Sequence, residues 1–256
     1  MNNRRAWTRE EEIVVFNLYC KIPFQRSSKN HPDVIRIANL IDRSPSSVNM
    51  KIGNFGSFDE SLSRQGIVGL TNASKLDKEI WDEFCGNWDE LAFESERIIA
   101  NLQGKSVDDG SEIENIPYGM IRTATVKQRV NQRFFRSAVL SAYADSCCIT
   151  GLNNTILLIA SHIKPWVDST EFEKTNPCNG LCLNALHDKA FDKGFITVTP
   201  DCKIHISSDV SDVCNGETVD MYFKRFENKK ITIPQKFAPS KMYLEYHNDM
   251  IFEHWK

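Results

Sequence analysis

The sequence predicts an α+β protein whose first half is helical and whose second half combines short strands with helices. Helical patterns with N-caps fill the first 70 residues, and a longer amphipathic stretch follows them. From Cys147 onward, short apolar runs rich in β-formers alternate with polar turns. These observations divide the chain into an N-terminal domain at 1–70, a helical connector with a linker at 71–120, and a C-terminal domain at 121–256.

The first domain is expected to hold three short helices. The first begins after Thr8, an N-cap with Glu11 three residues later in a capping-box pattern, and Pro23 ends it. The second runs through PDVIRIANLID, whose apolar residues recur at helical spacing. In RSPSSVNMKIGNF, Ser44 is the expected N-cap of the third helix, and Gly53 lies near its expected end.

Three short helices, the last opening with small polar residues, are typical of a helix-turn-helix arrangement that binds DNA. Small side chains at the start of a helix let it approach a groove closely. Serine-rich helix starts are also ordinary N-caps, so both interpretations stay open. The side chains expected to point outward toward nucleic acid are Ser46, Ser47, Asn49 and Lys51.

The middle of the chain is predicted to be one or two amphipathic helices followed by a polar, acidic linker at 103–115. A basic helix follows within TVKQRVNQRFFRSAVLSAY. Between Asn115 and Ala144 there is no acidic residue, which suits contact with a nucleic acid, although a solvated helix face explains the pattern equally well. The positive charges of this stretch are Arg122, Lys127, Arg129, Arg133 and Arg136.

Bulk composition excludes several classes of protein. The 256 residues are 41% hydrophobic and 25% charged, and no apolar run approaches the ~20 residues of a membrane span. The basic N-terminus lacks the apolar segment of a secretory signal, so we expect a cytoplasmic protein with no membrane partner. The net charge of −3 argues against a general polyanion binder. None of the eight cysteines forms a CxxC pair, so we expect reduced thiols and no structural zinc.

The C-terminal domain carries an ordered set of polar residues on its expected elements. A strand within NTILLIASHI ends near His162, a second strand begins after Asn179, and a helix from Ala185 to Lys193 bears His187. Hydrolysis of a phosphodiester needs a water deprotonated near neutral pH, where imidazole titrates. It also needs a divalent cation to stabilise charge on the phosphate, while an amide side chain can fix the loop that carries the base. A hairpin, FITVTPDCKIHIS, and a closing helix complete the domain.

The run CCITG…ASHIKPW…NGLCLNALHDKAFDKGF resembles the HNH endonuclease family, with its ββα-metal site, and in particular the restriction-type members. The resemblance implies that His162 is the general base, Asn179 the orienting asparagine and His187 a metal ligand, so these three are the candidate catalytic residues. Asn184 competes for the orienting role, but its position at the helix start favours capping.

Two departures from the family pattern bear on the metal. The CxxC pairs that bind zinc in many members are missing, and Ser161 stands where many members carry an acidic ligand. The second ligand would then come from Asp188 or Asp192, and we favour Asp192 beside His187. So few protein ligands suit an oxygen-preferring ion, Mg²⁺, with Mn²⁺ as a substitute.

These expectations combine into a metal-dependent endonuclease that hydrolyses double-stranded DNA, a restriction enzyme of antiviral defence. Cleavage of both strands would call for a homodimer or two binding events, and dependence on base modification is left open. The alternatives are a non-catalytic DNA-binding protein with a degenerate HNH scaffold, motivated by Ser161, and a nuclease that acts on RNA or single strands. An A-form RNA major groove excludes a recognition helix, which favours duplex DNA.

Overall fold

A computed structural model describes residues 5–67, 69–70, 72–107, 120–210 and 216–253, with the side chains of the long central helix described from residue 124. The contacts divide the chain into two compact units, Met1–Ala138 and Val139–Lys256. The predicted linker lies largely outside the described residues. None of the helices in the described ranges is long and apolar enough to cross a membrane.

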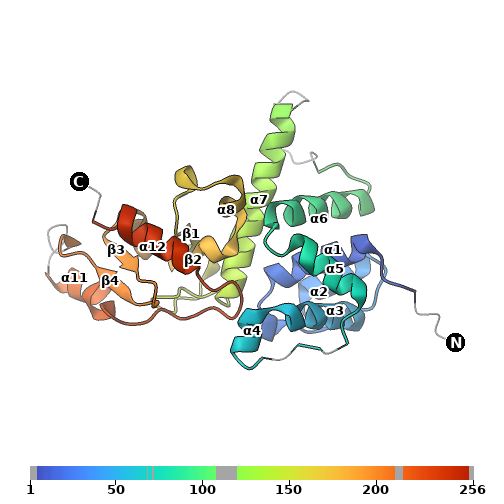
Figure 1. Ribbon diagram of the computed structural model, residues 1–256, viewed down its shortest axis with the longest axis horizontal. Helices are drawn as coiled ribbons and strands as arrows, with labels where there is room; N and C mark the ends of the chain where they lie inside the picture. Colours follow the sequence, from blue (N-terminus) through green and yellow to red (C-terminus); the bar gives the residue numbers. More distant parts are fainter. Residues whose placement is uncertain (1–4, 68, 71, 108–119, 211–215, 254–256) are drawn as a thin grey trace. The chain divides into compact units, whose positions relative to one another are not determined.

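The N-terminal unit is helical throughout its described residues (Figure 1). Helices α1, α2 and α3 correspond to the three predicted from the sequence, and α5 and α6 to the predicted connector, which packs on α1 within the same unit. Helix α7 runs on into the second unit. The bounds are α1 (Arg9–Lys21), η1 (Phe24–Arg26), α2 (Pro32–Leu40), α3 (Pro45–Phe58), α4 (Glu60–Arg64), α5 (Lys75–Phe84), α6 (Trp88–Leu102) and α7 (Met120–Ala142).

Helix α1 is the centre of this unit. Every residue from Glu11 to Cys20 is buried, because α2, α3, α5 and α6 all pack around it. A helix buried on all sides needs no narrow apolar stripe. Its aromatic side chains form the core, with Phe16 stacked on Phe55 at 4.8 Å between centroids and tilted against Trp81 at 5.2 Å. The predicted capping box at Thr8 is present.

Helix α3 continues to Phe58, past the end predicted at Gly53. Gly53 does not mark the end of the helix. It lies where two segments of the chain approach each other closely. The amide of Leu70 donates to the Gly53 carbonyl at 3.1 Å, and a Cβ on Gly53 would lie 3.0 Å from the Leu70 side chain. The residues around Gly53 give no sign that a contact with Leu70, far along the chain, requires a glycine at this position.

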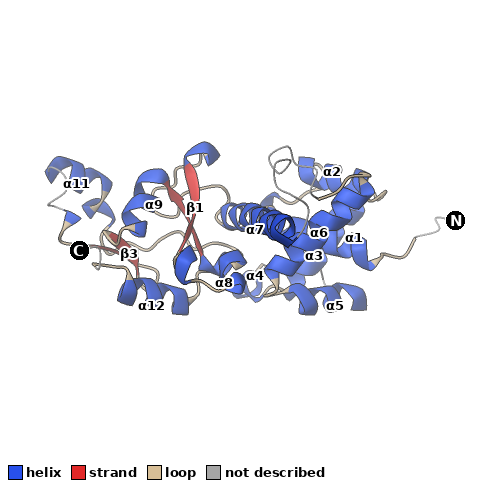
Figure 2. Ribbon diagram, turned by 90° about the horizontal axis from the view of Figure 1, so that it is seen from above, coloured by secondary structure: helices blue, strands red, loops and turns tan. Residues whose placement is uncertain are grey.

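All described strands belong to the C-terminal unit, as Figure 2 shows. The two strands β1 (Leu158–His162) and β2 (Gly180–Asn184) are antiparallel, with His162 opposite Gly180 and Leu158 opposite Asn184. Helix α9 (Ala185–Asp192) packs against both strands. This strand–strand–helix order is the one predicted. The first strand is shorter than predicted, because the Asn154 side chain caps a 3₁₀ turn, η2 (Thr155–Leu157), ahead of it.

The predicted hairpin and closing helix are also present in this unit. Strand β3 pairs antiparallel with β4, and α12 packs on β3. Gly194 follows α9 at φ +69°, a left-handed conformation in which any Cβ would lie 2.2 Å from the Ile251 carbonyl oxygen. The remaining bounds are η3 (Trp166–Asp168), α8 (Glu171–Thr175), η4 (Pro177–Asn179), β3 (Ile196–Val198), β4 (Ile204–Ile206), α11 (Gly216–Tyr222), η5 (Lys224–Phe226) and α12 (Lys241–Met250).

Candidate functional site

His162 ends β1 and is anchored by a carbonyl of α8. One ring nitrogen, Nε2, lies 2.9 Å from the carbonyl oxygen of Lys174. A carbonyl oxygen only accepts, so Nε2 carries the proton and Nδ1 is the unprotonated nitrogen of the neutral ring. Burial lowers the pKa of His162, and the hydrogen bond to Lys174 offsets this only in part. The imidazole is therefore neutral at pH 7 and able to accept a proton at Nδ1.

Asn179 lies directly before β2 and is completely buried. Its Oδ1 accepts from the backbone amide of Lys164 at 2.8 Å. Its Nδ2 reaches the carbonyl oxygens of Lys164 and Glu173, each at 3.2 Å. One amide side chain thus ties the residues after His162 to α8, whose last turn supplies the carbonyl that holds the His162 ring.

Asp188 on α9 faces the strand that carries His162. The hydroxyl of Ser161, the residue before His162, lies close enough to favour the charged form of this carboxylate. Burial raises the pKa of Asp188, and the negative charge of Asp192, one turn further along α9, acts in the same direction. Two carboxylates four residues apart on one helix suit a hard cation. Its positive charge would stabilise the half-buried Asp188 carboxylate and reduce the repulsion between Asp188 and Asp192.

Asp192 itself is 61% exposed and lies 4.0 Å from Lys189. Together with Asp188 it could offer two carboxylates to a cation. Within the described part of the chain, no group of three or more His, Cys, Asp or Glu side chains could hold a metal. A cation here would therefore keep several waters, as Mg²⁺ does.

His187 is buried and hydrogen-bonded to protein groups. It is 2% exposed, and Nε2 donates to the carbonyl oxygen of Tyr222 at 2.9 Å. Its Nδ1 lies 2.9 Å from Nδ2 of Asn184, whose Oδ1 also accepts from the His187 backbone amide at 3.0 Å, so Asn184 is a helix cap as the sequence suggested. Both ring nitrogens thus have protein partners in this structure, and the metal-ligand role of His187 stays a prediction.

Burial lowers the pKa of His187 as well, so the ring is neutral. The ring packs edge-on against Phe223 and Phe226, at 5.8 and 5.5 Å between centroids. It forms part of the wall of a cavity of about 670 Å³ lined mostly by apolar side chains, among them Leu157 and Leu186. These contacts indicate that His187 joins α9 to the segment 222–226.

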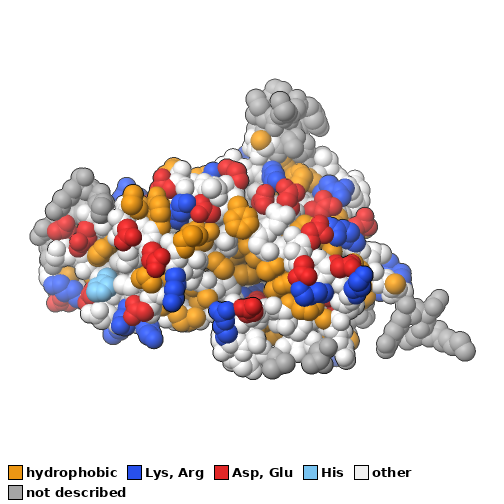
Figure 3. Space-filling view, viewed as in Figure 1, with side chains coloured by type: hydrophobic (Ala, Val, Ile, Leu, Met, Phe, Trp, Pro, Cys, Tyr) orange, Lys and Arg blue, Asp and Glu red, His pale blue; other side chains and the backbone are white. Residues whose placement is uncertain are grey.

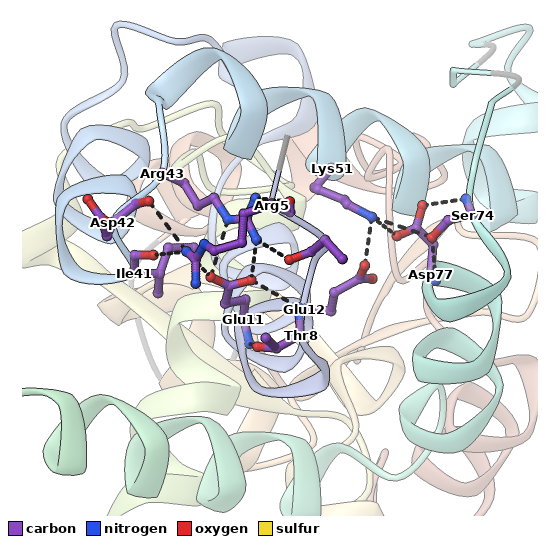
Figure 4. A network of polar contacts seen from close by, with 11 residues as sticks. Arg5, Thr8, Glu11, Glu12, Ile41, Asp42, Arg43, Lys51, Ser74 and Asp77 are labelled. Atoms are coloured by element: carbon purple, nitrogen blue, oxygen red, sulfur yellow. Dashed lines mark hydrogen bonds and ion pairs between the residues drawn. The ribbon is translucent and has the colours of Figure 1, made fainter. Parts of the chain in front are cut away.

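On the third helix of the N-terminal unit, Lys51 does not point to solvent as predicted. Figure 4 shows its ammonium between the carboxyl groups of Glu12 and Asp77, with Nζ 2.6 Å from Glu12 Oε1. Lys51 is 6% exposed, so its charge is neutralised inside the unit. This arrangement removes Lys51 from the residues available to DNA, because α3 packs on α1 and α5 along this face.

The other predicted contacts on α3 are distributed unevenly. Ser46 is exposed, while Asn49 accepts a hydrogen bond from the Ser27 hydroxyl at 2.7 Å. Ser47 borders a cavity of about 460 Å³, which is also lined by Trp7 and Arg43, whose guanidinium lies 4.5 Å from the Trp7 ring centroid. Ser46 also lines this cavity, whereas the hydroxyl oxygen of Ser47 is buried.

The basic residues of α7 differ in their surroundings. Lys127 lies 3.2 Å from Asp89 and also pairs with Glu90, so it contributes to packing of α7 on α6. Arg133 and Arg136 are exposed and Arg129 is half-buried, while the side chain of Arg122 lies outside the described residues. On the face drawn in Figure 3, acidic and basic side chains are interspersed over the N-terminal unit.

Sequence patterns did not reveal two features of the site. The contact between Asp188 and Ser161 joins residues 27 positions apart, although Asp188 lies next to the favoured His187. The ion pair between Lys164 and Glu173, with Nζ 2.9 and 2.7 Å from the two carboxylate oxygens, closes the loop that follows His162. A basic and an acidic residue nine positions apart in a loop give no signal in the sequence.

Residues 147–199 match the family model of the HNH endonucleases. The matched segment begins before β1 and ends after β3, so it contains His162, Asn179 and α9. No curated protein sequence is significantly similar to the chain. This segment is thus similar to an HNH endonuclease domain, which supports nuclease chemistry on a nucleic acid.

Proposed function

We propose that the chain is a metal-dependent endonuclease that hydrolyses phosphodiester bonds of double-stranded DNA, with His162 as the general base. The observation that carries this proposal is the state of His162. Its ring is neutral, Nε2 is held by the Lys174 carbonyl, and Nδ1 is the proton acceptor. A general base needs both a fixed orientation and an unprotonated nitrogen near neutral pH.

His162 would take a proton from the water that attacks the phosphorus atom. Such proton transfer contributes about 10²- to 10⁴-fold to a rate. Asn179 does not need to touch the substrate, since its amide fixes the backbone on both sides of the loop that follows His162. It acts as a positioning residue, in keeping with the orienting role expected from the family resemblance.

Asp188 and Asp192 would hold the divalent cation, in place of the predicted pair His187 and Asp192. Both carboxylates lie on α9, and Asp188 contacts the residue next to the base. An ion bound there supplies charge stabilisation for the phosphate and the departing oxygen. All-oxygen ligands favour Mg²⁺, with Mn²⁺ as a substitute.

Recognition of DNA is assigned to the N-terminal helices and to α7. Ser46 at the start of α3 and Arg133 of α7 are exposed and are the polar side chains proposed to contact DNA. We extend the proposal to a cytoplasmic restriction enzyme of the defence type, on the strength of the family resemblance of the sequence. A homodimer would allow cleavage of both strands.

A plasmid cleavage assay tests this function. Purified protein is incubated with unmodified, cytosine-methylated and hydroxymethylated DNA in Mg²⁺, Mn²⁺ or EDTA, beside a His162→Ala variant. A matched control is His205→Ala, which removes an exposed histidine of β4 in the same unit. We expect metal-dependent cleavage that is lost in His162→Ala, retained in His205→Ala, and accompanied by unchanged DNA binding.

The rival function is a DNA-binding protein without catalysis, favoured by the serine at position 161 in place of an acid. Binding of every substrate without cleavage in any metal would establish this rival. Cleavage restricted to RNA or single-stranded DNA would instead identify the third alternative. Equal loss of binding and cleavage in His162→Ala would refute the role of His162 as a base.

A further inference from the structure

The loop between β1 and β2 contains a second linkage besides Asn179. Lys164 Nζ lies between the two carboxylate oxygens of Glu173, at 2.9 and 2.7 Å. The two side chains are only 18% and 14% exposed, so solvent screens this ion pair little. The Lys164 ammonium also lies 5.3 Å from the ring centroid of Tyr246 on α12.

Glu173 performs a second task in the same loop. Its Oε2 accepts from the backbone amide of Thr170 at 2.8 Å, which completes a capping box at the start of α8. Burial alone would raise the pKa of Glu173, but hydrogen bonds from Lys164 and Thr170 outweigh it and lower the pKa. The carboxylate is therefore ionised at pH 7, and it links Lys164 to the start of α8.

These contacts converge on the carbonyl that orients His162. Lys164 lies two residues after His162, and Glu173 directly precedes Lys174, whose carbonyl accepts from His162 Nε2. A helix of five residues has little stability of its own, because formation of its first turn is unfavourable. Its carbonyls keep their direction only if contacts outside the helix hold it.

We infer that Lys164 and Glu173 are a positioning pair, which keeps the Lys174 carbonyl aimed at Nε2 and so holds His162 in the tautomer with an unprotonated Nδ1. Without the ion pair, α8 moves relative to β1 and the ring exchanges between its two neutral tautomers. Only one of them presents Nδ1 as a base in the proposed direction. The catalytic consequence rests on the proposed nuclease function, whereas the tautomer itself does not.

The test uses Glu173→Gln, which keeps an acceptor for the Thr170 amide but removes the charge, and Lys164→Met, which keeps most of the apolar stem. Removal of one partner leaves a buried charge and can unfold the loop, so the double variant Lys164→Met/Glu173→Gln is made as well. The matched control is Glu171→Gln, which removes an 83% exposed carboxylate paired with Lys174 in the same short helix.

The primary measurement is long-range ¹H–¹⁵N NMR of the histidine rings in the full chain, with His162 assigned from a His162→Gln spectrum. We expect one tautomer in the wild type and in Glu171→Gln, with a protonated Nε2. The folded charge variants should show a mixture of the two tautomers. An unchanged single tautomer in the folded double variant would overturn the inference, whatever its cleavage activity.

Cleavage kinetics supply the second measurement. A small misplacement of a reacting group can cost about 10²-fold in rate, so we expect kcat of the double variant to fall about 10- to 100-fold with KM nearly constant. A fall in kcat without a change of tautomer would contradict the inference. Absence of cleavage by the wild type would defeat the proposed function alone, since the tautomer measurement does not depend on activity.

Discussion

His187 donates from Nε2 to the carbonyl oxygen of Tyr222 at 2.9 Å, and this bond joins α9 to the end of α11. The opposite ring nitrogen is satisfied by the Asn184 amide at 2.9 Å. A neutral imidazole has one donor and one acceptor, and protein groups use both. The histidine that the sequence suggests as a metal ligand therefore has protein partners at both ring nitrogens, and our proposal gives the cation to the carboxylates on the same helix.

His187→Ala should destabilise the protein without weakening metal binding. The substitution removes a buried ring that donates to the Tyr222 carbonyl and packs on Phe223 and Phe226, and loss of such a hydrogen bond costs about 0.5–1.5 kcal/mol. Urea unfolding in EDTA measures the loss, and calorimetric titration of the folded variant with Mg²⁺ measures the affinity. A large loss of Mg²⁺ affinity with unchanged stability would restore the ligand role of His187.

Asp188→Asn should weaken metal binding without destabilising the protein. Burial raises the pKa of Asp188, so the folded state disfavours its charged form, and the neutral amide should keep or raise the melting temperature in EDTA. Mg²⁺ at 100 times its Kd stabilises the wild type by about 2.7 kcal/mol, because it binds only the folded protein. We expect this increase to disappear in Asp188→Asn.

A suitable control for this measurement is Asp201→Asn, which removes an exposed carboxylate in the turn between β3 and β4. The control should keep the Mg²⁺-dependent rise in melting temperature. An equal rise in wild type and Asp188→Asn would show that Asp188 does not hold the ion.

The sequence predicted the site in outline because its parts are consecutive elements. Strand, loop, strand and helix follow one another, so the order of His162, Asn179 and α9 could be inferred from local patterns. The direction of a helical side chain could not be inferred this way. His187 and Asp188 are adjacent, about 100° apart around the helix, and only the packing of α11 decides which of them faces β1.

In the N-terminal unit the same difficulty appears at Lys51. Helical spacing placed Val48 and Ile52 inward, and both are buried, but it placed Lys51 outward. The surface around Lys51 is covered by α1 and α5, which contribute Glu12 and Asp77. A charged residue whose partners lie 39 and 26 positions away carries no local signal of burial.

The pH dependence of cleavage should reflect the lowered pKa of His162. Burial lowers that pKa below its ordinary value of 6.5, so the base stays unprotonated in mildly acidic solution. At saturating Mg²⁺, we expect kcat to reach its plateau with a midpoint below pH 6.5. Single-turnover rates from about pH 4.5 to about pH 8, on both sides of the ordinary value, measure this midpoint. A midpoint above pH 6.5 would contradict the buried, neutral state of the ring.

A buried carboxyl in the N-terminal unit should make stability depend on pH near neutrality. Glu12 is 0% exposed, and burial, with Asp77 beside it, raises its pKa to about 8 although Lys51 opposes the shift. The folded state therefore binds a proton that the unfolded chain, with a pKa of 4.5, has released. The contribution of this proton to the free energy of unfolding is complete below pH 4.5 and is lost as the pH rises toward 8.

The expected slope is at most about 1.4 kcal/mol per pH unit, the value for one proton. Lowered histidine pKa values, such as about 4 for His247, act in the opposite direction only below pH 6.5, so the interval from 6.5 to 8 isolates Glu12. Urea unfolding across this interval should show a falling free energy of unfolding in the wild type. Glu12→Gln has no proton to lose and should give a flat profile, and equal slopes in the two proteins would assign the proton to another group.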